Sequence, residues 1–143
     1  MGGKKIADLK GLWMRKKVLI VEDNDHVRQL VSLMLKARGH LVVEAVNCKD
    51  ALGKLGDSKI GLVITGLCMH RRDGLEFIQE LKKKSGYESL PIVVLTSRFH
   101  EYKKKAAELA GVSSWVAKPF IPRKLIPAVE GLWNKNTSRK ETV

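Results

Sequence analysis

The sequence predicts an α/β protein in which five βα units build a doubly wound parallel sheet. Two observations lead to this fold class. Short, continuously apolar segments, which are typical of parallel strands buried on both faces, alternate with amphipathic segments of helical spacing. Glycine follows several of the amphipathic segments, where helices commonly end. This alternation predicts right-handed helical crossovers, with helices on both faces of the sheet.

The first two units follow this pattern closely. The apolar run 18–21 is the first strand, and the apolar residues of 27–35 recur at helical spacing before Gly39 ends that helix. Polar residues between this strand and this helix offer several N-caps. The second strand is expected at 41–46, and a short helix at 48–56.

The remaining three units repeat the order. Strands are expected at 61–65, 91–97 and 113–118, and helices at 75–84, 100–110 and 122–133. Pro91 opens its strand, where no ladder donor is lost, and Gly111 closes the helix before the last strand. The predicted domain therefore spans 17–133, between a basic N-terminal arm at 1–16 and a polar, basic tail at 134–143 that we expect to be mobile.

Composition limits the class of protein. A chain of 143 residues suits one domain, and two cysteines are too few for a disulfide framework. No apolar run approaches the roughly 20 residues of a membrane span, and the N-terminus has no secretion signal, so we expect a cytoplasmic protein without a membrane partner. The net charge of +12 is expected to lie mainly on solvated helix faces. Attraction to nucleic acid or to an acidic protein is the alternative.

Polar residues gather where the predicted strands end. Glu22 and Asp23 follow the first strand, Thr96 ends the fourth, and Lys118 ends the fifth. The carboxyl ends of parallel strands form the crevice where ligands of open α/β sheets bind. Paired carboxylates can hold Mg²⁺, and a hydroxyl with a lysine can hold phosphoryl oxygens. Gly66 directly follows the third strand and has no side chain to offer.

Four segments together resemble the CheY-like receiver domains of two-component response regulators. These segments are "VLIVEDN", "LVITGLCMHRRDGLEFI", "VVLTS" and "VAKPF", and the resemblance extends over 17–133. It implies a flavodoxin-like fold with strand order 2-1-3-4-5. It also implies a domain that accepts a phosphoryl group from a histidine kinase, on an aspartate that ends the third strand.

The resemblance gives a role to the residues of the first and third strand ends. Glu22 and Asp23 correspond to the acidic pair that binds Mg²⁺, together with the backbone carbonyl of Cys68. Gly66 occupies the position of the phosphoacceptor aspartate, so the nucleophile and one direct metal ligand are absent. We therefore expect no cofactor beyond weakly bound or lost Mg²⁺.

The resemblance also implies phosphoryl-contact and switch positions, which are Thr96, Trp115 and Lys118. Pro119 is expected to follow Lys118 through a cis peptide bond. The face built by 100–110, 113–118 and 122–133 is where receivers dock partners, and its lysines suit a protein with an acidic surface, or a homodimer. The residues expected on this face are Phe99, Tyr102, Lys103, Lys104, Lys105 and Trp115.

These features favour a pseudo-receiver, a stand-alone signalling domain that acts by protein–protein contact and is not phosphorylated at the usual position. The alternative is a receiver that works in other respects and whose acceptor has been substituted. A basic nucleic-acid-binding module is disfavoured, because the sequence has no helix-turn-helix, zinc site or aromatic platform. An enzyme is not expected, since no nucleophile converges with a base.

Overall fold

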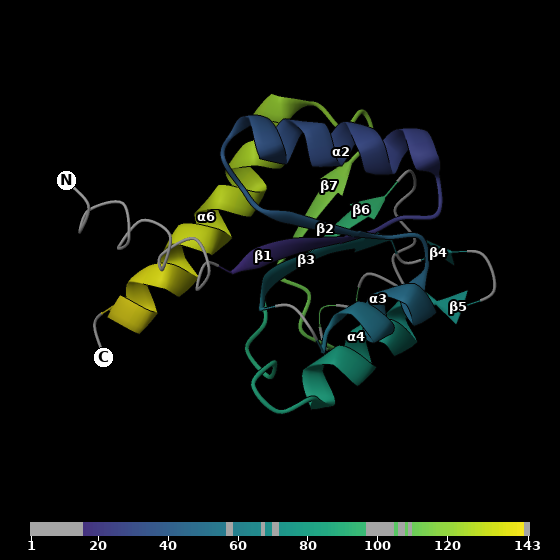
Figure 1. Cartoon of the computed structure of the whole chain (residues 1–143), viewed down its shortest axis with the longest axis vertical. Coiled ribbons are helices and arrows are strands. Elements are labelled where there is room, and N and C mark those ends of the chain that lie inside the picture. Colours follow the sequence, from purple (N-terminus) through teal and green to yellow (C-terminus); the bar gives the residue numbers. More distant parts are fainter. Residues whose placement is uncertain are drawn as a thin grey trace, which may run out of the picture.

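The computed structural model of the chain describes residues 16–56, 59–66, 68, 69, 72–96, 105, 108 and 110–141. Five strands form a parallel sheet in the order β2-β1-β3-β6-β7 (Figure 1). They are β1 (Lys17–Val21), β2 (Val42–Ala45), β3 (Ile60–Gly66), β6 (Ile92–Thr96) and β7 (Ser114–Ala117). Counted along the chain, this order is 2-1-3-4-5, so the predicted flavodoxin-like topology is confirmed.

Helices cover both faces of the sheet. They are α2 (Asp25–Ala37), α3 (Cys48–Lys54), α4 (Gly74–Lys83) and α6 (Pro122–Glu141). In Figure 1, α2 and α6 lie on one side of the strands, and α3 and α4 lie on the other. The helix predicted at 100–110 falls largely outside the described residues. Within this range the structure describes Lys105, Glu108 and Ala110, and all three are helical.

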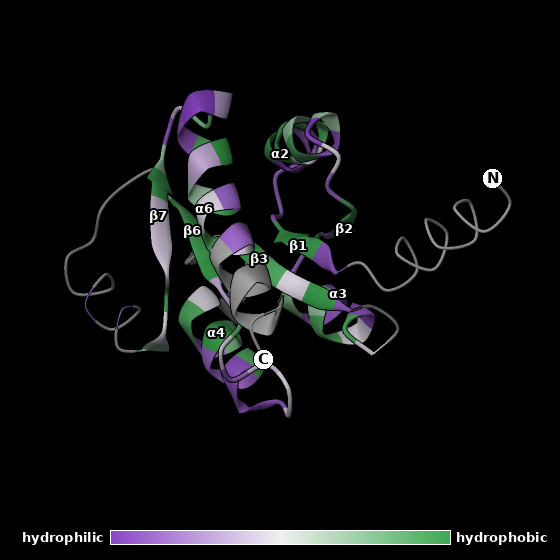
Figure 2. Ribbon diagram, turned by 90° about the vertical axis from the view of Figure 1, so that its left-hand side faces the viewer, coloured by the Kyte–Doolittle hydropathy of each residue, from purple (hydrophilic) through white to green (hydrophobic). Residues whose placement is uncertain are grey.

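Alternating side chains of the strands build two cores, one beneath each pair of helices. On β1, Val18 and Ile20 belong to the core under α2 and α6, while Leu19 and Val21 belong to the core under α3 and α4. The parallel register continues the alternation, because Ile20 pairs with Ile64, a member of the same core. Figure 2 shows the strands largely in hydrophobic colours between the helices. Such two-sided burial explains why the strands read as unbroken apolar runs.

The structure differs from the sequence-based prediction at two places. Helix α6 continues to Glu141, whereas the helix was expected to end at 133 and to give way to a mobile tail. Residues 134–141 contain no glycine or proline that would stop a helix, and in Figure 1 this part of α6 (yellow) extends beyond the sheet. The second difference is a small antiparallel hairpin of β4 (Cys68–Met69) and β5 (Arg72–Asp73), which was not predicted.

Strand β2 forms one edge of the sheet, and two side chains of α3 bind its outer backbone groups. Lys54 Nζ donates to the Glu44 carbonyl oxygen at 2.6 Å, and the Val46 N–H donates to Asp50 Oδ2 at 3.0 Å. Lys54 also pairs with Asp50, with 3.0 Å between Nζ and Oδ2. These contacts join the short helix α3 to the edge strand before it.

Trp133 packs α6 against the beginning of β3, at a glycine. A Cβ at position 61 would lie 2.9 Å from Trp133 Cζ3 and 2.8 Å from Lys16 Cβ. Both separations are shorter than normal carbon–carbon contacts, so this close approach of α6 to the sheet requires Gly61. The indole also meets the His40 ring edge-on, with the ring centroids 5.6 Å apart.

We predict that Gly61→Ala destabilises the protein by about 1–3 kcal/mol, because the added methyl group displaces Trp133 or Lys16. The matched control is Gly53→Ala in α3, where a Cβ would meet no atom within 4 Å. This control should leave stability unchanged or raise it by up to about 1 kcal/mol, since alanine favours helix. Urea unfolding measures both. Equal midpoints for Gly61→Ala and the parent would contradict the packing described for Trp133.

An ion pair connects the C-terminal end of α2 to α6. Arg38 donates from Nε and Nη2 to Glu130 Oε1, at 3.0 Å and 2.6 Å. The His40 side chain is buried, and its Nε2 lies 3.5 Å from Glu130 Oε2. The hydrogen bonds from Arg38 hold the pKa of Glu130 below its ordinary value of 4.5. A carboxyl with a lowered pKa stabilises the fold above that ordinary value, and this contribution is lost as the pH falls through the lowered one.

We therefore predict that Glu130→Gln lowers the free energy of unfolding at pH 7, by less than about 1 kcal/mol because the pair is partly solvated. The difference from the parent should shrink below pH 4.5, as the parent's own carboxyl becomes protonated. Glu108→Gln, at an exposed helical position before β7, is the control and should change little at either pH. A difference that stays constant from pH 7 to acid would show that the ion pair is not its cause.

Candidate functional site

The register of the sheet brings the predicted site residues to one edge. Val21 pairs with Thr65, Gly66 pairs with Leu95, and Thr96 pairs with Ala117, so β1, β3, β6 and β7 end at similar heights. Glu22, which follows β1, and Lys118, which follows β7, therefore leave the sheet at the same edge as Gly66 and Thr96. This edge is where open α/β sheets bind ligands.

Glu22 and Asp23 form a close acidic pair. Glu22 is partly buried and Asp23 is exposed. Burial raises the pKa of the Glu22 carboxyl above its ordinary value of 4.5, and the charge of Asp23 and a hydrogen bond with it act in the same direction. The Asn24 N–H, which donates to Glu22 Oε1 at 3.2 Å, opposes this rise in pKa, and the Lys118 ammonium does so to a smaller extent. Electrostatics therefore couples Glu22, which follows β1, to Lys118, which follows β7.

Asn24 is the cap that begins α2, from among the several polar candidates in the sequence. Its Oδ1 accepts the Val27 N–H at 3.0 Å, and its backbone is extended, as expected for an N-cap. The side chains of Glu22 and Asp23 are therefore not the cap of this helix. The acidic pair precedes the helix as a separate feature.

Gly66 is the last residue of β3 and brings no side chain to the edge. The neighbouring hydroxyl does not replace the missing group. Thr65 is fully buried, and its Oγ1 donates to the Gly66 carbonyl oxygen at 3.2 Å. Because side chains alternate along a strand, Thr65 lies on the face of Val63, under α3 and α4, and position 66 lies on the other face.

The positions implied for phosphoryl contact and switching lie on β6 and β7. Thr96 is half-buried at the end of β6, and Lys118 is exposed after β7. The Lys118–Pro119 peptide bond is cis, as the resemblance implied. Trp115 is partly buried and packs against the core under α3 and α4, so much of its ring has a structural role.

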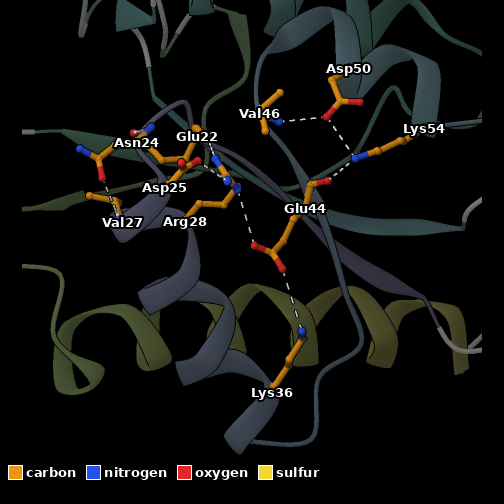
Figure 3. Close-up of polar contacts among 10 residues, drawn as sticks. All are labelled: Glu22, Asn24, Asp25, Val27, Arg28, Lys36, Glu44, Val46, Asp50 and Lys54. Atoms are coloured by element: carbon orange, nitrogen blue, oxygen red, sulfur yellow. Dashed lines mark hydrogen bonds and ion pairs between the residues drawn. The ribbon is translucent and has the colours of Figure 1, made fainter.

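Arg28 is a further residue of this region that the sequence analysis missed. Its guanidinium reaches the Glu22 carbonyl oxygen, Asp25 and Glu44, so it joins the acidic pair to α2 and to β2 (Figure 3). A signal for it exists in the sequence, because Glu44 interrupts the apolar strand 41–46 and a half-buried carboxylate needs a cation nearby.

The donor set fits a hard divalent cation only in part. Two carboxylates lie together at Glu22 and Asp23, and oxygen ligands are those that Mg²⁺ prefers. The backbone of Cys68 follows in β4, directly beyond the strand end. Position 66 adds no oxygen from a side chain, and among the described residues no group of three or more histidine, cysteine, aspartate or glutamate side chains gathers as a metal cluster. The residues therefore fit a weak site.

A comparison with protein-family models matches residues 18–130 to the response regulator receiver domain. The chain belongs to this family. The two-component signalling role that the sequence suggested is therefore confirmed at the level of the family, and receiver domains are signalling domains that interact with protein partners.

Curated relatives of this receiver domain differ in length. Protein PilG of Pseudomonas aeruginosa is 27% identical over 114 residues, which are 80% of this chain and 84% of PilG. The phosphate regulon transcriptional regulatory protein PhoB of Escherichia coli is 27% identical over 122 residues, 85% of this chain. The receiver domain spans only 53% of PhoB, about half of that protein's length.

Solved structures show the same fold. The chemotaxis protein CheY4 of Vibrio cholerae has a TM-score of 0.78 and 31% identity, with 82% of the present chain and 98% of the CheY4 chain covered. NtrX of Brucella abortus has a TM-score of 0.81 and 27% identity, with 90% of the present chain and 29% of the NtrX chain covered.

The expected partner face is described only in part. Lys105 is exposed and helical, and Trp115 is half-buried on β7. The other predicted members, Phe99, Tyr102, Lys103 and Lys104, lie outside the described residues, as does most of the N-terminal arm. Within the part of the chain that the structure describes, no helix has the length and apolar character needed to cross a bilayer.

Proposed function

We propose that the chain is a pseudo-receiver, a receiver domain that acts through protein–protein contact and accepts no phosphoryl group at position 66. The observation that carries this proposal is Gly66 at the end of β3, where the family's phosphoacceptor carboxylate belongs. An acyl phosphate needs a carboxylate, and the adjacent hydroxyl of Thr65 is buried and bonded to the backbone. No catalytic activity is expected of such a domain, and we expect it to work in the cytoplasm.

A second candidate is a receiver whose acceptor alone has been substituted. The retained acidic pair favours it, as do Thr96, Lys118 and the cis peptide bond before Pro119, because these are features that the family resemblance assigns to a phosphoryl site. The two candidates differ in what a restored carboxylate would do. In the second candidate it would be sufficient for phosphoryl transfer.

We predict that the parent protein gains no phosphoryl mass when it is incubated with Mg²⁺ and acetyl phosphate, because the phosphoacceptor position, Gly66, has no carboxylate. Intact-mass spectrometry makes the measurement. Gly66→Asp restores the nucleophile, and Gly66→Asn is its matched control, with a side chain of equal size and no carboxylate.

A stoichiometric adduct on the parent would overturn the pseudo-receiver. An adduct on Gly66→Asp, with none on the parent or on Gly66→Asn, would show that the acceptor is the one missing part and would favour the second candidate. If all three proteins stay unmodified, the site has lost more than its acceptor, and the pseudo-receiver is favoured.

The exposed charges on the expected partner face support the proposal that the partner is a protein with an acidic surface. Lys105 is exposed on the helix before β7, and Arg123 and Lys124 are exposed in the first turn of α6. Helix α6 has no acidic residue in that turn, although acidic residues would suit its dipole. Arginine and lysine at a helix N-terminus are unfavourable for the helix dipole but would complement an acidic partner. The alternative is a homodimer through the same face.

We predict that Lys105→Glu slows association with a partner that has been captured on the immobilised chain and identified by mass spectrometry. Exposed charges at the edge of an interface mainly change the association rate, and salt should reduce the effect. Lys83→Glu reverses an equally exposed lysine on α4 and is the control. Equal losses for both variants would indicate a general charge effect and would contradict the assignment of this face.

A further inference from the structure

We propose that Arg28 is the positioning residue of the acidic pair: it fixes the peptide unit between Glu22 and Asp23 and so sets how Asp23 is presented to a cation. The inference rests on the proposed function in one respect, which is that Glu22 and Asp23 form a cation site. Arg28 does not itself contact the cation. It acts through the backbone that carries the pair.

The central contact is with the backbone of Glu22. Arg28 Nη1 donates to the Glu22 carbonyl oxygen at 2.8 Å (Figure 3). This oxygen belongs to the same planar peptide unit as the N–H of Asp23. A hydrogen bond that holds the carbonyl therefore also holds the plane from which the Asp23 side chain departs.

The following turn is held as well. The Asn24 N–H donates to Glu22 Oε1 at 3.2 Å, and the Arg28 N–H donates to the Asn24 carbonyl oxygen at 3.0 Å. The second bond is the first backbone hydrogen bond of α2, which any non-proline residue at this position would make, so the side-chain contact with Glu22 is the one particular to Arg28. Asp23 lies between these two anchoring points.

The guanidinium is itself held from two sides. Nη2 donates to Asp25 Oδ1 at 2.5 Å, and Nε lies 3.6 Å from Glu44 Oε1 on the edge strand β2. Glu44 Oε2 in turn lies 4.0 Å from Lys36 Nζ. One orientation of the Arg28 side chain serves all three acceptors, and this side chain is only 11% exposed. The fork of five donors makes this possible, and a lysine, with one ammonium on a flexible stem, could not reproduce it.

Charge and position make opposite predictions for Arg28. A fixed positive charge near two carboxylates repels a divalent cation, so loss of the charge alone would tighten Mg²⁺ binding. Loss of the positioning contact would weaken Mg²⁺ binding, as substitutions of groups that orient metal ligands commonly do. The sign of the change in affinity therefore separates the two roles.

The experiment is a titration with Mg²⁺, followed by the backbone amide resonances of residues 22–25. It uses the parent chain and Gly66→Asp, in which a third carboxylate should strengthen binding. Each background carries Arg28→Lys, which keeps the charge, or Arg28→Met, which removes it. Arg38→Met is the control, because Arg38 caps the other end of the same helix and pairs with Glu130, away from the strand ends.

In the Gly66→Asp background we expect Arg28→Lys and Arg28→Met to weaken Mg²⁺ binding by about 10-fold, and Arg38→Met to leave it unchanged. Without Mg²⁺, the Asp23 amide resonance should move in Arg28→Lys and stay in place in Arg38→Met. This second measurement reports position even where the affinity is low. If Arg28→Met unfolds, Arg28→Lys still decides, since its ammonium keeps the charge but lacks the fork of donors that holds the Glu22 carbonyl and both carboxylates at once.

Unchanged affinity in Arg28→Lys, or tighter binding in Arg28→Met, would overturn the proposal. Absence of Mg²⁺ binding in both backgrounds would overturn it too, because the acidic pair would then not be a cation site. All of these results leave the pseudo-receiver proposal standing, because it is overturned only by phosphoryl mass on the parent chain.

Discussion

The parallel alignment of β1, β3, β6 and β7 is the constraint on which the rest of the structure depends. Each strand buries alternate side chains in two cores, so a slip by one residue would exchange every side chain between the faces of the sheet. Burial therefore fixes the register, and the register places the strand ends at one edge. The positions of Glu22, Gly66, Thr96 and Lys118 follow from packing that occurs elsewhere in the molecule.

Two arginines on α2 show how surroundings give the same side chain different roles. Arg38, with a side chain that is 58% exposed, pairs with Glu130 and links two helices on one side of the sheet. Arg28, at 11%, is nearly buried and divides its donors among a backbone carbonyl and two carboxylates. A solvated ion pair contributes little to the stability of the fold, so its residues can be substituted at small cost. A buried guanidinium must keep its partners, so it constrains the backbone to which it is bonded.

Much of the fold could be predicted from the sequence, because two-sided burial produces apolar runs and helices leave a periodic pattern. The strands and the first three helices were located in this way, and the family resemblance then assigned roles at the strand ends. The end of α6 could not be predicted, since polar residues after Trp133 are compatible with either a helix or an irregular tail. The hairpin of β4 and β5 is too short to leave a periodic pattern.

The role of Arg28 could be predicted only in part, because Glu44 within the second strand indicates a cation nearby but does not identify it. The spacing of Arg28 from Asp25 indicates a contact within the helix, but the contact with Glu44 joins residues from separate elements. Only the pairing of β1 with β2 brings Glu44 beside the beginning of α2. Similarly, the sequence shows that position 66 is a glycine but not that the hydroxyl of Thr65 is bonded to the backbone.

The contacts of Lys54 and Asp50 with β2 have a consequence for the behaviour of the protein at high concentration. An edge strand exposes unpaired amides and carbonyls, to which a strand of another molecule can add and so begin aggregation. In a parallel pair, alternate residues direct these groups away from the neighbouring strand. The Glu44 carbonyl of β2 is such a group, and the Val46 N–H lies directly beyond the strand; α3 binds both with its own side chains. Helix α3 therefore reduces the capacity of this edge of the sheet to pair with a strand of another molecule.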